Sequence, residues 1–232
     1  MSFFRHAIPA TSTIIKNLIA WWKLGDSQTS AKSSFNNNDI TLIGSPTINL
    51  NNSLLFNGSS QAGSVNIDLS LYNKITLCFW LNIGSYANTN RVGLEYSANY
   101  NSLDGFLVLI DSSPTAEIIP SMHSTNGAGG YQARNYSVMP ANETHFYSII
   151  LDRTTGTSPG VFLYIDGNLQ TPTATPPILN DLGGTNFGNY PLYIMSRAGN
   201  SAWGLGELND LRIYNGYLTQ EEIKILYKLR AK

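Results

Sequence analysis

The segment KITLCFWLNI, residues 74–83, decides the fold class of this chain. In an extended strand its side chains alternate between two faces, so that Ile75, Leu77, Phe79, Leu81 and Ile83 share one face. The other face carries Thr76, Cys78, Trp80 and Asn82. Because that second face includes a tryptophan and a cysteine, we expect both faces to be covered. This is typical of a central strand in a two-layer sandwich.

Short strand patterns continue outward from this segment in both directions, separated by Gly, Asn and Pro turns. They cover residues 18–24, 53–58, 64–69, 105–110, 117–122, 145–152, 161–166, 191–195 and 207–214. Segments 105–110 and 117–122 could pair, and Asp166-Gly167 predicts a tight turn. We predict an all-β fold, a two-sheet antiparallel jelly-roll sandwich.

One short C-terminal α-helix is predicted after the last strand. Thr219 and Glu222 have the spacing of a capping box, in which each side chain bonds the other residue's backbone N–H. Ile223, Leu226 and Tyr227 then form one apolar face at helical spacing.

The chain predicts one domain, residues 18–232, after an N-terminal arm, residues 1–17. The arm lacks hydrophobic periodicity. It is interpreted either as a loose terminus or as an arm that docks on a neighbouring subunit.

Composition excludes several classes of protein. The net charge is −1 and charged residues make up 12% of the chain, about half the usual share, which does not favour nucleic-acid binding. No apolar run reaches the ~20 residues of a membrane span. The single cysteine, Cys78, excludes an intrachain disulfide and a cysteine-rich zinc site. A surface rich in Asn, Ser, Thr and Gly suits a protein displayed outside a cell or on a virion, and no signal peptide is visible.

Several stretches together resemble the laminin-G-like, concanavalin A-like lectin/glucanase superfamily, and its pentraxin-like bacterial and viral members in particular. They are SLLFNGSSQAGSV (53–65), ITLCFWLNI (75–83), HFYSIILDRTTG (145–156), VFLYIDGNL (161–169) and GELNDLRIYNGYLTQEEIKILY (206–227). Their order and spacing match that family over residues 18–229. The resemblance implies the jelly-roll sandwich and a recognition role.

The resemblance also implies one structural Ca²⁺ ion at an edge of the sandwich. The positions that match the family's ligands are Asp26, Asn57, Asn209 and Asp210. Calcium takes six to eight oxygen ligands, usually including carboxylates. The alternative is that Asp26 and Asp210 cap turns or bond backbone amides.

Two predicted loops have the chemistry of a glycan site, since sugars are held by aromatic faces and by amide and hydroxyl groups. The first, residues 85–102, offers Tyr86, Arg91, Tyr96 and Tyr100. The second, residues 196–206, offers Arg197, Asn200 and Trp203. The alternative for Trp203 is that it plugs one end of the sandwich.

Catalysis is not expected. Glycosidic cleavage needs two carboxylates flanking the bond, and the 15 acidic residues include no pair at i, i+2 or i, i+4 within a predicted strand. Carboxylates from different strands could still converge. The three histidines, His6, His123 and His145, show neither triad nor zinc spacing.

The sequence therefore predicts a non-catalytic recognition module. Its expected setting is a virion or appendage surface, as a homo-oligomer or assembly subunit that binds glycans or neighbouring structural subunits. The alternatives are a secreted lectin-like domain and a polysaccharide-active glycosidase.

Overall fold

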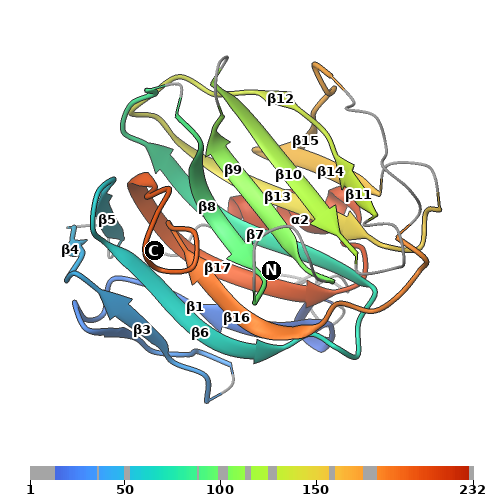
Figure 1. Cartoon of the computed structure of the whole chain (residues 1–232), viewed down its shortest axis with the longest axis horizontal. Coiled ribbons are helices and arrows are strands. Elements are labelled where there is room, and N and C mark those ends of the chain that lie inside the picture. Colours follow the sequence, from blue (N-terminus) through green and yellow to red (C-terminus); the bar gives the residue numbers. More distant parts are fainter. Residues whose placement is uncertain are drawn as a thin grey trace, which may run out of the picture.

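The computed structural model describes residues 14–35, 37–49, 53–87, 89–98, 104–112, 116–124, 130–156, 160–174 and 182–229. Within these residues the strands form two antiparallel sheets, one of eight strands and one of nine (Figure 1). The predicted all-β, two-sheet sandwich is confirmed.

The eight-stranded sheet has β7 and β17 at its centre. In spatial order it contains β15 (Asn168–Leu169), β14 (Val161–Ile165), β13 (Thr144–Asp152), β7 (Lys74–Ile83), β17 (Leu205–Asn215), β5 (Leu54–Asn57) and β4 (Thr47–Ile48). The eighth strand, β1 (Leu18–Trp22), also pairs with β17.

The nine-stranded sheet lies in front in Figure 1. In order it contains β11 (Tyr131–Ala133), β10 (Glu117–His123), β9 (Phe106–Asp111), β8 (Arg91–Tyr96), β16 (Asn189–Ile194), β6 (Ala62–Asp68), β3 (Ile40–Ile43) and β2 (Ser30–Ala31). The ninth strand, β12 (Tyr136–Ser137), pairs with β10.

The main hydrophobic core fills the space between the sheets. All five apolar residues on the first face of 74–83 belong to it, together with side chains such as Val65, Leu192 and Ile194 of the opposite sheet. At about 25 cal/mol per Å² of apolar surface removed from water, this layer supplies the main favourable contribution to folding.

The helix α2 (Gln220–Lys228) covers the other side of β7 and β13. Its Ile223 and Leu226 form a second buried cluster with Cys78, Trp80 and Phe146. The predicted capping box is present: Thr219 accepts from the backbone of Glu222, whose side chain accepts from the backbone of Thr219. Both faces of β7 are therefore covered, as the sequence predicts.

The strand predictions are confirmed, including the pairing of β9 with β10 and the bounds of β7. One predicted element was wrong: the predicted loop 85–102 contains β8, a strand in the middle of the nine-stranded sheet. Its Asn- and Tyr-rich flanks hid the short apolar pattern of residues 92–96. Short strands such as β3 were not predicted.

The predicted N-terminal arm lies mostly outside the described residues. Ile14 is buried in the cluster beneath α2, and the Asn17 carbonyl accepts a hydrogen bond from the Asn215 amide. Residues 14–17 therefore pack on the domain, and docking by residues 1–13 stays a prediction. Among the described residues, no helix is both long enough and apolar enough to cross a membrane.

Candidate functional site

A polar groove of about 380 Å³ lies on the outside of the nine-stranded sheet, within the ~300–1,000 Å³ range of small-molecule sites. Its lining residues are Asn37, Asn38, Asp39, Thr41, Ser64, Val65, Asn66, Pro191 and Tyr193. Most of them present an amide, a hydroxyl or a carboxylate, so the groove offers many hydrogen-bonding groups in a small space.

Strand alternation builds the floor of the groove. Val65 and Leu192 point into the core, so Ser64, Asn66, Pro191 and Tyr193 point outward from β6 and β16. The strand register places these residues side by side. Ser64 of β6 pairs with Thr41 of β3 and with Tyr193 of β16, and Asn66 pairs with Pro191.

The segment 37–39, just before β3, forms one wall and is fixed to the domain. The indole of the fully buried Trp22 donates to the Asn38 carbonyl at 2.6 Å. The Asp39 carboxylate accepts from the Ser33 amide at 2.9 Å and from the Lys32 ammonium at 2.7 Å. A hydrogen bond from Lys32 lowers the pKa of Asp39, so this carboxylate is charged at neutral pH. The wall is therefore organised before any ligand arrives.

The loop between β16 and β17 borders the groove beside Tyr193. A Cβ atom at Gly199 would lie 3.7 Å from the Tyr193 ring and 3.2 Å from the Ile43 side chain. The buried Glu95 carboxylate of β8 accepts from the Ala198 amide at 3.1 Å and from the Ser97 hydroxyl at 2.7 Å. Glu95 thus ties this loop to the sheet.

The candidate residues of this loop lie beside the groove but do not line it. Asn200 is exposed, and Trp203 and Arg197 are half-buried. The charge of Arg197 contributes to the lowered pKa of His123 on β10. In the sheet order β10 lies beyond β8 and β9, away from the groove.

Tyr86 and Arg91 are held by the protein itself. The Tyr86 hydroxyl donates to the Met139 carbonyl at 2.5 Å, and burial raises the pKa of Tyr86 to about 12. Arg91 donates to the Ser85 carbonyl at 2.8 Å and lies 3.7 Å from the buried Asp111 carboxylate. These contacts give both side chains a structural role at the start of β8.

Tyr96 was wrongly placed on a ligand-binding loop. It is fully buried on β8, and its hydroxyl bonds the Ile67 and Gly188 carbonyls and the Leu69 and Tyr190 amides. These hydrogen bonds join the ends of β6, β8 and β16. Tyr100 lies outside the described residues.

The protein's own groups engage three of the four predicted calcium ligands. The buried Asp210 carboxylate accepts from the Arg212 guanidinium at 2.9 and 2.6 Å and from the Trp21 indole at 2.5 Å. Asn57 accepts from two turn amides, and Asp26 accepts from the Lys32 amide. Asn209 pairs in register with Trp80. Because Arg212 already neutralises Asp210, this carboxylate is a poor ligand for calcium. Calcium binding at these positions stays a prediction.

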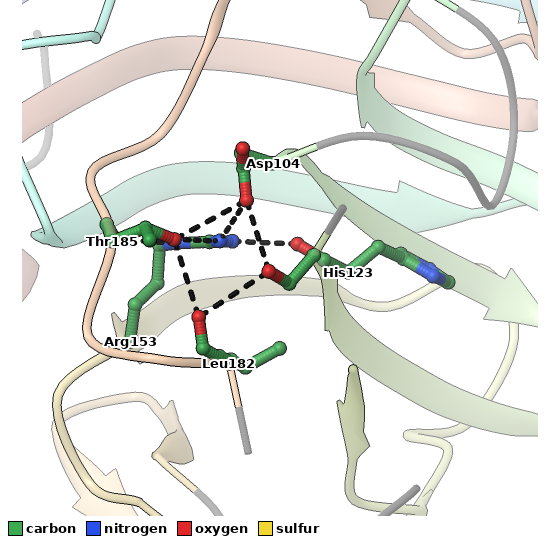
Figure 2. Close-up of polar contacts among 6 residues, drawn as sticks. Asp104, His123, Arg153, Leu182 and Thr185 are labelled. Atoms are coloured by element: carbon green, nitrogen blue, oxygen red, sulfur yellow. Dashed lines mark hydrogen bonds and ion pairs between the residues drawn. The ribbon is translucent and has the colours of Figure 1, made fainter. Parts of the chain in front are cut away.

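A well-connected polar cluster surrounds Arg153, the residue just after β13 (Figure 2). This fully buried guanidinium donates to the Asp104 carboxylate at 2.5 Å, the His123 carbonyl at 2.6 Å and the Thr185 carbonyl at 2.8 Å. Ser124 and Thr185 also donate to Asp104. Because the protein's own oxygens engage the guanidinium, the cluster joins distant segments and offers little to a ligand.

The lining of the groove was missed by sequence reasoning. The alternation in 64–69 does place Ser64 and Asn66 opposite Val65 and Ile67, which marks an outward polar face. The sequence gives no indication, however, that β3, β6 and β16 are neighbours.

A family model described as "Concanavalin A-like lectin/glucanases superfamily" matches residues 56–224. No curated protein sequence matches the chain significantly.

Solved structures with the same fold include binding domains of botulinum neurotoxins. The serotype D domain has a TM-score of 0.70 at 16% identity, over 94% of this chain and 52% of that one. A structure of botulinum neurotoxin type C, whose cell entry depends on interaction with two ganglioside molecules, has a TM-score of 0.69 at 14% identity. The match covers 94% of this chain and 52% of that one. A serotype D domain in complex with N-acetylneuraminic acid has a TM-score of 0.70 at 15% identity, over 95% and 53%. This chain thus spans about half of each.

Proposed function

Since the chain belongs to the concanavalin A-like lectin/glucanase superfamily, we propose that it is a non-catalytic glycan-binding module whose sugar site is the groove on β3, β6 and β16. The observation that carries this proposal is the lining itself. Asn37, Asn38 and Asn66 supply amides, Thr41 and Ser64 supply hydroxyls, and the Tyr193 ring lies among them.

This combination matches the surface of a sugar. A pyranose ring presents hydroxyl groups around its rim and a C–H patch on its face, so it needs polar partners together with an aromatic surface. The groove provides both on a rigid sheet, with one wall fixed by Trp22 and Asp39. Two of the similar solved structures are described with sialic acid or gangliosides, which supports a glycan as the class of ligand.

The biological setting that we propose is the surface of a virion or appendage, with neighbouring subunits as further partners. A nearly neutral chain with 12% charged residues supports a protein that works on an exposed surface. Light scattering of the full chain and of a variant lacking residues 1–13 tests assembly. A monomer in both forms contradicts it.

A glycan array on the full chain tests the glycan site, followed by titration of the strongest hit. Tyr193→Ala and Asn66→Ala should each weaken binding about tenfold or more, which corresponds to about 1.4 kcal/mol. Both side chains point away from the core, so the thermal midpoint should change little. Asn168→Ala, an equally exposed asparagine on β15 of the other sheet, is the matched control. A blank array, or equal binding by all variants, rejects the groove as the site.

A further inference from the structure

The charge of the groove limits the ligands that it can accept. Among its described lining residues Asp39 is the only one with a formal charge, and no Lys, Arg or His lines it. The ammonium of Lys32, an exposed side chain, lies 2.7 Å from the Asp39 carboxylate. That cation is therefore already paired with the one carboxylate that lines the groove.

A second cation near the groove, Arg197, is not one of its lining residues. Arg197 belongs to the bordering loop, but its charge acts on His123 of β10. In the sheet order β8 and β9 separate β10 from β16, the strand of Tyr193. The described lining beside Asn66 and Tyr193 therefore contains no arginine.

The hydrogen-bonding groups of the lining also favour a ligand without a negative charge. Side-chain amides and hydroxyls can each donate and accept, which suits sugar hydroxyl groups because they also do both. A carboxylate ligand accepts only and is best held by a charged donor such as arginine. Here it would instead meet the Asp39 carboxylate, with which it has no favourable charge interaction.

We propose that this groove selects neutral, hydroxyl-rich glycans and rejects those that place a carboxylate, as in sialic or uronic acids, at the Asp39 wall. The selection is exerted by Asp39, whose own cationic partner is Lys32. This inference rests on the proposed glycan-binding function, and it differs from the sialic acid of the serotype D complex.

An array of matched glycan pairs, each with and without a terminal sialic acid, tests this selectivity on the full chain. We expect binding to neutral members and at least about tenfold weaker binding to their sialylated partners. Stronger binding to sialylated members overturns the neutral selectivity but leaves the glycan site intact. Binding to no member rejects the glycan function, and the selectivity falls with it.

Asp39→Asn tests the residue that sets the selectivity. An asparagine oxygen can still accept from the Ser33 amide, while Lys32 loses its partner and leaves a positive charge at the wall. The ratio of sialylated to neutral affinity should rise about tenfold in this variant. Glu221→Gln, at an exposed position in the first turn of α2, changes the net charge equally and should leave the ratio unchanged. An unchanged ratio in Asp39→Asn, or an equal rise in both variants, contradicts the role of Asp39.

Discussion

His123 shows how packing fixes the charge of a single side chain. It is buried at the end of β10, and its ring lies 4.9 Å from the Tyr131 ring. Burial, with the nearby charges of Arg153 and Arg197, lowers its pKa to about 4 from 6.5. The folded protein therefore keeps this imidazole neutral at pH values where the unfolded chain protonates it.

Stability should consequently fall as the pH drops from about 6.5 toward about 4. In this window the unfolded state binds more protons at His123 than the folded state, so the free energy of unfolding rises with pH. The full effect is about 3 kcal/mol, at roughly 1.4 kcal/mol for each pKa unit. Urea denaturation at pH 7.5 and pH 4.5 measures it.

His123→Gln isolates this contribution, because glutamine does not titrate. The difference in unfolding free energy between the two pH values should be smaller in the variant than in the unchanged protein. Equal differences in the two proteins would show that other groups carry the acid sensitivity.

The adjacent residues Trp21 and Trp22 show what can be predicted for single side chains. Alternation along a strand predicts that one points in and the other out, and Trp22 is fully buried while Trp21 is half-buried. Their polar partners could not be predicted. Trp22 bonds the Asn38 carbonyl and Trp21 bonds Asp210, contacts that depend on the tertiary packing of the chain.

At the level of the element, α2 is the segment that the sequence defines most completely. Its start is specified by the capping box, and its buried face comes from Ile223 and Leu226. All of these signals are local. The helix also covers Trp80, whose ring stacks on Tyr227 at 5.6 Å, so its ends affect the packing of β7.

Thr219→Ala should lower the free energy of unfolding by about 1 kcal/mol. The substitution leaves the Glu222 amide without its side-chain acceptor and removes one half of the capping box. Thermal or urea denaturation measures the loss. Thr219→Ser retains the acceptor oxygen and should recover most of the stability, and an equal loss in both variants would exclude capping as the cause.

The long apolar pattern of β7 fixed its bounds, whereas some short strands were missed. β7 has ten residues and its bounds were found, whereas β3 has four and was missed. β8 was taken for a loop because Asn- and Tyr-rich segments flank its short alternating pattern of Val92, Leu94 and Tyr96. The candidate site could not be predicted from the sequence. The groove combines β3 with β6 and β16, and only tertiary pairing brings these strands together.

At the level of the whole molecule, the two outer faces of the sandwich are used differently. α2 covers β7 and β13 on one side, and the groove opens on β3, β6 and β16 on the other. The helix therefore contributes to stability without limiting access to the groove. A helix variant that still folds should bind glycan normally, which separates folding defects from binding defects.

The near neutrality of the chain predicts that its affinity for a neutral glycan depends little on ionic strength. The net charge is −1, and the proposed ligand is neutral, so long-range charge contributes little to their association. Affinity for the strongest neutral glycan should change by less than about twofold between roughly 50 and 500 mM NaCl, a range over which the screening length falls severalfold. Asp39→Asn should bind a sialylated glycan through the unpaired Lys32, and this affinity should fall with salt. A steep salt dependence for the unchanged protein would mean that an ionic contact, rather than the neutral lining of the groove, holds the ligand.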